Sequence, residues 1–460
     1  MADFSAAQIL AATGGRLIAG MASANCSGIA TDSRAVAAGQ CFVALRGERF
    51  DGNDFVLAAL QAGAAGAVVS RPPENLSQAR DEAAFVVLVE DTLRALGDLA
   101  RLHRGRFNLP VIAVTGSTGK TTTKGMIAAI LSLRGPIAAT PQNYNNEVGV
   151  PLALLSLMPE HTAAVIEMAM RGPGEIAHLA ALARPNIGVV TNVGLSHLER
   201  LGSPDAIADA KGELVEAVAE GASVLNADDP YFEWLARRAQ GRVISFGLNQ
   251  TAQFRAVEVT PDRDRTSFRL LCPAGEMQVM LTTPGRHQVL NALAAAAAAI
   301  AAGAGLDGVA AGLAAFAASR ARAQLVAGKS GFRVLDDCYN ASPASVEAAL
   351  ELLADLGARR KVAILGDMLE LGPTAPELHR AVGEEAGSVG LDLLITVGEL
   401  GWWIAEGARA VMPPESVRWA RSNDEAAAWA IEALGPGDIV LVKASRAMAF
   451  ERITERLIGD

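Results

Sequence analysis

The sequence of 460 residues has few of the side chains that build metal sites, cross-links or nucleic-acid interfaces. Its six histidines are dispersed and suggest no histidine-based zinc site. Lys and Arg number 40 against 50 Asp and Glu, without a basic block, so we expect no nucleic-acid partner. Four cysteines are present, and no pair has metal-ligand or CxxC spacing; they are Cys26, Cys41, Cys272 and Cys338. We therefore predict idle, reduced thiols.

Long apolar runs are also missing. The mean hydropathy is positive, at +0.25, but alanine causes the excess. The longest apolar run, residues 292–302, has 11 residues, whereas a membrane-spanning helix needs roughly 20. The first ten residues, MADFSAAQIL, lack the basic and apolar segments of a signal peptide. We therefore expect no membrane insertion and a cytoplasmic location.

The remaining composition is that of a large globular chain, with 51% hydrophobic and 20% charged residues. At roughly 150 residues per domain, this length favours three domains. We place their boundaries at 1–108, 109–318 and 319–460. The polar stretch 104–110 ends in Pro110 and is predicted to link the first two.

Short apolar runs that alternate with helical stretches predict an α/β fold throughout. In the central region, buried runs followed by helices are typical of a mostly parallel, doubly wound sheet. Residues 251–283 instead alternate polar and apolar side chains and predict an antiparallel extension, followed by helices at 286–302 and 306–317. A Rossmann-like unit is expected last. The expected strands are 41–45, 67–69, 85–89, 111–115, 163–166, 187–191, 223–226, 332–335, 362–365, 393–397 and 439–442.

The strongest motif is Thr-Gly-Ser-Thr-Gly-Lys-Thr-Thr at residues 115–122, between a predicted strand and a predicted helix. Such a loop turns backbone N–H groups toward phosphates, and the helix N-terminus adds partial positive charge. It departs from the general P-loop pattern, because position 114 is Val where that pattern has Gly. We predict a triphosphate site whose loop residues are Gly116, Ser117, Thr118, Gly119, Lys120, Thr121 and Thr122. Lys120 is expected at the β- and γ-phosphates and the Thr121 hydroxyl on Mg²⁺.

Other polar residues allow a structural and a functional interpretation. Glu167 ends a predicted strand, where a Mg²⁺ ligand belongs, but a solvated strand-end carboxylate fits as well. His197 fits a hydrogen-bonded loop residue, and Lys211 a solvated charge on a helix. The Asn-rich segment 143–146 fits a turn and helix cap.

The segment TGSTGKTTTK resembles the ATP loop of the Mur ligase family, whose members join a carboxylate to an amine through an acyl phosphate. The resemblance continues in family order through TDSR at 31–34, DDCYNASP at 336–343 and LGDMLELG at 365–372, followed by His379. It implies an N-terminal UDP-substrate domain, a central P-loop ATPase and a C-terminal ligase domain. The chain departs from the family pattern at Asn53, Ser342 and Ala444, where His, Asn and Gly are expected.

The resemblance also implies roles for single residues. It makes Glu167 and His197 metal ligands, and Lys211 a carbamylated lysine that helps to hold a second Mg²⁺. Asn291 and Asp337 are expected at the nucleotide. The residues expected at the substrates are Ser33, Arg34, Asn143, Asn145, Asn146, Tyr339 and Asn340.

The segments 335–343 and 365–372 are similar to those of family members that add D-alanyl-D-alanine to UDP-N-acetylmuramoyl-tripeptide. The Asp-Asn-Pro-Arg segment of diaminopimelate-adding members is missing. The implied cofactors are ATP and two Mg²⁺, the implied substrates are those two molecules, and a monomer is expected. Two alternatives stay open: a sibling such as folylpolyglutamate synthetase or the diaminopimelate-adding ligase, and a P-loop switch ATPase without an acceptor.

We expect Lys120→Ala to abolish ATP-dependent turnover, because it removes the cation that stabilises charge on the γ-phosphate. The loss of one preorganised donor typically costs about 10²–10³ in rate, and a cationic donor should cost at least that. Steady-state ADP release measures the effect. Near-normal turnover would overturn the assignment of the loop.

Overall fold

The structure is a computed structural model that describes residues 2–74, 84–141, 144–262, 265–317 and 321–459. Contacts divide the chain into two compact units. The first contains residues 1–114, 134–170 and 174–188, and the second contains 115–133, 171–173 and 189–460. Among the described residues, no helix combines the length and apolar character that crossing a bilayer requires.

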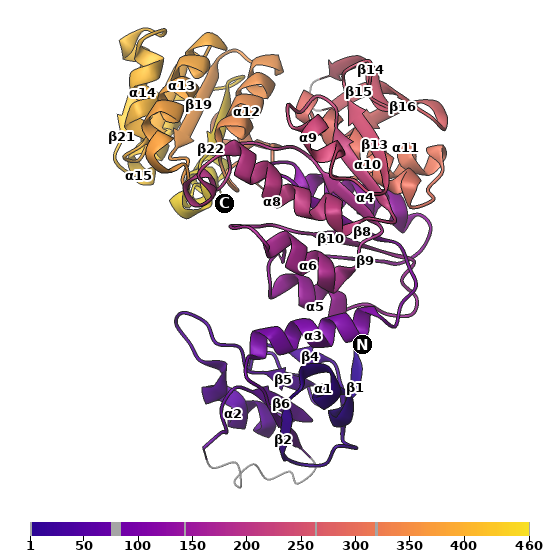
Figure 1. Cartoon of the computed structure of the whole chain (residues 1–460). Helices are drawn as coiled ribbons and strands as arrows, with labels where there is room; N and C mark the ends of the chain where they lie inside the picture. Colours follow the sequence, from indigo (N-terminus) through magenta and orange to yellow (C-terminus); the bar gives the residue numbers. More distant parts are fainter. Residues whose placement is uncertain (1, 75–83, 142–143, 263–264, 318–320, 460) are drawn as a thin grey trace. The chain divides into compact units, whose positions relative to one another are not determined.

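A five-stranded sheet of order β2-β7-β6-β5-β4 forms within the first unit (Figure 1). Its strands are β2 (Arg16–Ala19), β4 (Ile29–Ala30), β5 (Cys41–Val43), β6 (Gly66–Val69) and β7 (Phe85–Leu88). β4 to β7 are parallel and β2 is antiparallel to β7. β1 (Asp3–Ser5) pairs separately with β3 (Asn25–Ser27). The helices of this region are α1 (Ala6–Thr13), α2 (Val56–Gln61) and α3 (Thr92–Arg104).

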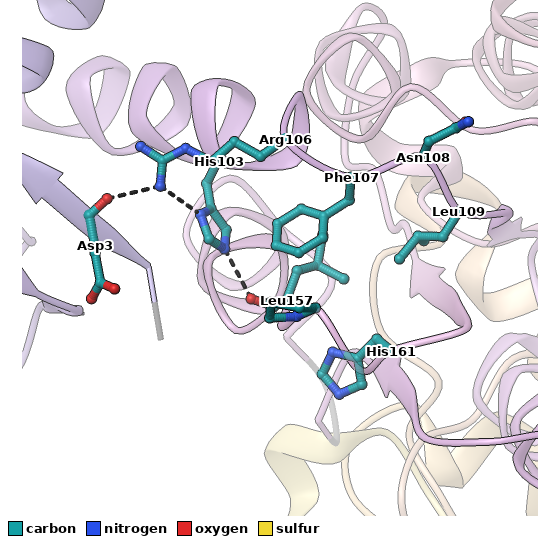
Figure 2. Close-up of a pocket in the computed structure, with 9 residues that line it drawn as sticks. Asp3, His103, Arg106, Phe107, Asn108, Leu109, Leu157 and His161 are labelled. Atoms are coloured by element: carbon teal, nitrogen blue, oxygen red, sulfur yellow. Dashed lines mark hydrogen bonds between the residues drawn. The ribbon is translucent and has the colours of Figure 1, made fainter.

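The C-terminal end of α3 includes the first residue of the predicted linker. The helix continues to Arg104, whose buried Nε donates to the Ala183 carbonyl at 2.9 Å. The neighbouring His103 ring contacts the Leu157 carbonyl at 2.9 Å, and Arg106 donates to the Asp3 carbonyl at 2.8 Å (Figure 2). A cavity of about 440 Å³ is bordered by Asp3, His103, Arg106 and Leu157. The stretch 104–110 therefore begins as packed structure, because its cationic side chains satisfy backbone carbonyls of neighbouring segments.

A nine-stranded sheet has the order β16-β15-β14-β13-β12-β11-β8-β10-β9. β8, β9 and β10 pair in parallel in the first unit, as do β12, β13 and β14 in the second. β14, β15 and β16 are antiparallel, which confirms the predicted extension. The strands are β8 (Val111–Thr115), β9 (Ile137–Ala139), β10 (Ala163–Glu167), β11 (Ile187–Val190), β12 (Ala222–Asn226), β13 (Arg242–Gly247), β14 (Phe254–Asp262), β15 (Arg265–Cys272) and β16 (Gly275–Leu281).

Eight helices are interspersed with these strands along the described chain. They are α4 (Lys120–Ser132), α5 (Gly149–Leu155), α6 (Glu175–Ala183), α7 (Leu198–Leu201), α8 (Pro204–Ala217), α9 (Phe232–Ala236), α10 (Arg286–Ala301) and α11 (Leu306–Ala315). α10 contains the alanine-rich run, and its alanines are buried from position 294 to 299. Alanine lets neighbouring elements approach closely, so this apolar run packs in a core.

A six-stranded sheet of order β17-β18-β22-β19-β20-β21 lies in the second unit, shown in orange and yellow (Figure 1). Only β17 is antiparallel to its neighbour among the pairs described. The elements are β17 (Gln324–Ala327), β18 (Arg333–Asp336), α12 (Pro343–Asp355), β19 (Lys361–Gly366), α13 (Ala375–Ser388), β20 (Leu393–Val397), α14 (Gly401–Arg409), β21 (Val417–Ala420), α15 (Asn423–Ala433), β22 (Ile439–Lys443) and α16 (Glu451–Ile458).

Both faces of this sheet are buried, which accounts for its unbroken apolar strands. Leu335, Leu365 and Leu441 belong to a core cluster with residues of α12, α13 and α14. Val334 and Val440 belong to a second cluster with residues of α15 and α16. Helices on both faces of a mostly parallel sheet confirm the predicted α/β class.

Asp438, next to β22, is a fully buried carboxylate. It accepts from Arg359 Nε at 2.9 Å, Arg360 Nη2 at 2.7 Å and the Gly435 N–H at 2.9 Å. Burial by itself would raise the pKa of Asp438, but the hydrogen bonds from Arg360, Arg359 and Gly435 outweigh it and hold the pKa below its usual range. The ionised carboxylate thus ties the segment before β22 to that before β19.

We expect Asp438→Asn to lower the free energy of unfolding by about 2 kcal/mol at pH 7, because hydrogen bonds to a charged group are lost. A carboxylate whose pKa is lower in the folded than in the unfolded protein stabilises the fold at pH values above its unfolded-state pKa of about 4. This stabilisation is lost as the pH falls through the folded-state pKa. The difference in the free energy of unfolding between Asp438→Asn and the wild type should therefore shrink below about pH 4. Urea unfolding followed by tryptophan fluorescence measures it.

Asp424→Asn is the matched control. Asp424 is an exposed carboxylate on α15 that pairs with Arg456 on α16. Exposed ion pairs contribute little, so this variant should unfold like the wild type at every pH. If the free energies of unfolding of Asp438→Asn and the wild type differed by the same amount from pH 7 to pH 3, the titration of Asp438 would not explain its contribution to stability.

Candidate active site

The phosphate-binding loop connects β8 to α4, as predicted. α4 begins at Lys120 and is preceded by Gly119 at φ +78°. Lys120 Nζ donates to the Gly116 carbonyl at 2.6 Å and to the Ser117 carbonyl at 3.2 Å. The ammonium therefore lies over the loop and the N-terminal turn of α4, where anions bind.

Two loop positions admit no side chain. A Cβ on Gly119 would lie 2.3 Å from Asn291 Oδ1, and one on Gly116 would lie 1.9 Å from Thr191 Oγ1. Asn291 is buried on α10 and accepts from Thr123 Oγ1 at 3.3 Å. The structure thus brings Asn291 to the loop. Its predicted contact with the nucleotide stays a prediction.

The segment after β11 supports the same loop from the other strand. Asn192 accepts from the Ser117 N–H through its carbonyl and from the Thr118 N–H through Oδ1, both at 3.0 Å. Ser117 Oγ accepts from the Gly194 N–H at 2.7 Å. These bonds hold the loop in one conformation; the sequence did not single out Asn192.

Lys211, on α8, is buried and not solvated, so the surface-charge interpretation is wrong. Burial lowers the pKa of Lys211 well below its usual range, and the charge of Lys120 lowers it further, while Asp229 acts in the opposite sense. Asp229 accepts from the Val193 N–H at 2.7 Å and from the Tyr231 N–H at 2.8 Å. Burial therefore favours the neutral amine of Lys211, which lies beside the loop of residues 191–197.

His197 precedes α7 with φ +61°, a left-handed conformation. Its Nδ1 lies 2.5 Å from Glu370 Oε2. Burial lowers the pKa of His197 and outweighs Glu370, and the charges of Lys120 and Lys211 act in the same direction as burial. A neutral imidazole is the form that binds metals. Among the described residues, no three His, Cys, Asp or Glu side chains form a metal cluster by themselves.

Glu167 and Asn145 meet in the first unit. Glu167 is buried at the end of β10 and accepts from Asn145 Nδ2 at 2.9 Å, so it is not a solvated strand end. Asn146 Oδ1 accepts from the Gly149 N–H at 2.9 Å, which confirms the turn-and-cap interpretation for this residue. Asn143 lies outside the described residues.

The segment 31–53 is also in the first unit. Arg34 is exposed and pairs with Asp32 at 2.7 Å, and Ser33 is half-buried. Asn53, where His was expected, is buried: Nδ2 donates to Asp51 Oδ1 at 2.7 Å and Oδ1 accepts from the Ser70 N–H at 3.0 Å. An amide supplies both a donor and an acceptor here, so Asn53 is explained as a structural residue.

Three predicted residues gather at the carboxyl ends of β18 and β22. Asp337 Oδ2 lies 2.5 Å from Lys443 Nζ, which also donates to the Asn340 carbonyl at 3.1 Å. The Arg322 guanidinium lies 4.0 Å from the centre of the Tyr339 ring. Ser342, where Asn was expected, precedes α12 as its N-cap residue.

His287 on α10 was not singled out by the sequence. Burial lowers its pKa; the carboxylate of Asp337 acts in the opposite direction, and the charge of Lys443 acts in the same direction as burial. His287 lies one helical turn before Asn291, on the same side of α10. The four-residue spacing from Asn291 is the feature of the sequence that could have pointed to His287.

The segment 365–372 is held from three sides. Met368 N–H donates to His379 Nε2 at 2.8 Å, and His379 Nδ1 lies 2.6 Å from the Ala375 carbonyl. Asp367 Oδ1 accepts from the Gly401 N–H at 2.7 Å, and the Leu369 N–H donates to Ser445 at 2.9 Å. His379 is therefore a positioning residue for this segment.

Three family models match the chain in order. The Mur ligase family catalytic domain matches residues 25–104, the Mur ligase middle domain 114–299, and the Mur ligase glutamate ligase domain 321–446. The UDP-N-acetylmuramoyl-tripeptide–D-alanyl-D-alanine ligase of Bacillus subtilis is 38% identical over 438 residues, which cover 94% of this chain and 93% of the relative.

Solved structures give the same result. A crystal structure of MurF from Acinetobacter baumannii superimposes with a TM-score of 0.90 at 31% identity and covers 98% of both chains. MurF ligase from Thermotoga maritima in complex with ADP has a TM-score of 0.82 at 30% identity, over 93% of this chain and 96% of that one.

Proposed function

Because the chain belongs to the Mur ligase family, we propose that it adds D-alanyl-D-alanine to UDP-N-acetylmuramoyl-tripeptide, at the expense of ATP. The product is the UDP-linked pentapeptide precursor of peptidoglycan. The observation that carries this proposal is the identity to relatives named for this reaction over nearly the whole of both chains. ATP binding agrees with the phosphate loop and with the ADP complex of a relative.

We propose three domains, 1–108 for the UDP-substrate, 109–318 for ATP and 319–460 for ligation. Each family-model match falls within one of these ranges. Each of the large sheets does so too. The expected monomeric state and cytoplasmic location stay predictions.

The donors within the second unit suit magnesium if Lys211 is carbamylated, because Thr121 offers a hydroxyl oxygen and His197 a neutral imidazole. Glu167, in the first unit, is proposed as a further, carboxylate ligand. A protonated Lys211 would repel a metal ion, but a neutral amine can react with CO₂ to give an anionic carbamate. Burial favours that neutral amine, because it lowers the pKa of Lys211. When bound, two Mg²⁺ ions would offset charge on the phosphates and the acyl oxygen.

The chemistry follows from the poor reactivity of a carboxylate. Transfer of the γ-phosphoryl group to the tripeptide carboxylate gives an acyl phosphate and ADP. Lys120 and the loop N–H groups stabilise charge on the transferring group. The dipeptide amine then attacks the acyl carbon, and phosphate leaves from the tetrahedral intermediate. No covalent protein intermediate is required, in keeping with the proposed residue roles.

The remaining sequence-predicted residues divide between the ligands. Asn291 and Asp337 are proposed at the nucleotide, supported by the packing of Asn291 on the loop and the position of Asp337 at a strand end. The residues proposed at the UDP-peptide and dipeptide are Ser33, Arg34, Asn143, Asn145, Asn146, Tyr339 and Asn340.

Release of ADP tests the function directly. With ATP and Mg²⁺, release should require both UDP-N-acetylmuramoyl-tripeptide and D-alanyl-D-alanine, because the acyl phosphate forms on the first and is consumed by the second. Release with the UDP-dipeptide and diaminopimelate, or with a folate and glutamate, would instead identify a sibling ligase. Release without any acceptor would identify a switch ATPase.

The carbamate is tested by substitution at Lys211. Arg keeps a positive charge but cannot be carbamylated, so both Lys211→Arg and Lys211→Ala should lose about 10² or more in rate. Acetate should partly restore Lys211→Ala, because it supplies an anion. Lys329→Arg, at an exposed lysine, is the control and should be fully active. An active Lys211→Arg enzyme would mean that this residue acts as a cation.

A further inference from the structure

A junction of three contacts joins the segment at His197 to the segment at Glu370 within the second compact unit. His197 Nδ1 lies 2.5 Å from Glu370 Oε2. The Glu199 N–H donates to the Glu370 carbonyl at 3.1 Å. Gly372 packs so closely that a Cβ there would lie 3.2 Å from Glu199 Cα. The junction thus connects the segment before α7 with the segment after β19.

The backbone on both sides of the junction has an unusual conformation. His197 has φ +61° and Glu370 φ +64°, in the left-handed region that non-glycine residues seldom occupy. Such conformations persist only where the surroundings impose them, and they cluster at functional sites. Glu370 follows directly on Met368 and Leu369, whose N–H groups are bonded to His379 and Ser445. The segment therefore presents Glu370 from a fixed frame.

A carboxylate on one ring nitrogen determines what the other can do. Glu370 Oε2 lies 2.5 Å from Nδ1, and a carboxylate next to that nitrogen favours the neutral tautomer with its proton on Nδ1 and its lone pair on Nε2. Carboxylates in this position orient metal-binding histidines and increase their basicity. Glu370 reaches His197 from the proposed third domain, whereas the phosphate loop belongs to the proposed second.

We infer that Glu370 is a positioning residue that orients His197 toward the metal site and does so only while the third domain is docked on the ATP-binding domain. The inference rests on the proposed function, in which His197 is a metal ligand. It makes binding of the metal depend on the domain that is proposed to hold the dipeptide. Metal binding and docking of that domain then strengthen each other by thermodynamic linkage.

A plain surface ion pair is the competing explanation, because the side chains of His197 and Glu370 are 26% and 46% exposed. Such a pair would add little to stability and nothing to metal affinity. Metal affinity therefore separates the two explanations, and a change in folding does not.

The experiment titrates Mn²⁺ into the ADP complex of the full chain and measures free Mn²⁺ by electron paramagnetic resonance. Glu370→Gln keeps the shape of the side chain but removes its charge, and it should weaken Mn²⁺ binding about 10-fold or more. In a His197→Ala background the same change should have no effect, since the histidine it orients is gone. Glu377→Gln, at an exposed carboxylate on α13, is the control and should bind Mn²⁺ like the wild type.

The outcomes separate this inference from the proposed function. Equal Mn²⁺ affinity in wild type and Glu370→Gln overturns the role of Glu370, and so does an equal loss with and without His197. The ligase assay on the wild type is independent of both results. If that assay shows no ligation while the wild type binds Mn²⁺ and Glu370→Gln does not, the proposed reaction is wrong and the positioning role stands.

Discussion

The burial of Lys211 is the constraint on which the proposed chemistry of this protein depends. Removing an ammonium from water costs several kcal/mol unless a partner compensates for it. Asp229 lies close enough to act on Lys211, but its carboxylate already accepts two backbone N–H groups and its own pKa is raised by burial. The positive charge of Lys120 acts in the same direction as burial and favours the neutral amine of Lys211. The second unit therefore holds a buried lysine, with its uncharged form favoured, next to a phosphate-binding loop.

Close packing also shapes the phosphate-binding loop. Gly116 and Gly119 are in contact with Thr191 and Asn291, which come from a neighbouring strand end and from α10. The loop is thus shaped by packing against two other elements as much as by its own glycines. This explains why a spacing that departs from the general P-loop pattern still gives a working geometry: the N–H groups are directed by Asn192 and by the start of α4.

Elements and motifs that depend on neighbouring residues were predicted well. The run 111–115 became β8, and the helix after the glycine loop began at Lys120, since apolar runs, glycines and caps act within a few residues. The edge strands β17 and β21 were missed, because short strands at a sheet edge carry a weak apolar pattern, and the central strand β13 was missed as well. The linker at 104–110 stays a prediction except at Arg104, which ends α3 and is buried because α6 supplies the carbonyl that it binds.

The sequence alone determined the α/β class and the triphosphate loop, because these follow from periodicity and from a contiguous motif, whereas the residue types for a ligase were implied by the resemblance to the Mur ligase family. Tertiary structure decided which polar residues lose their water. In the folded chain Lys211 is buried instead of solvated. Asn53 connects two segments through its hydrogen bonds, and His197 lies next to Glu370. These outcomes depend on desolvation and on contacts between segments far apart in the chain, and both arise only when the strands and helices pack.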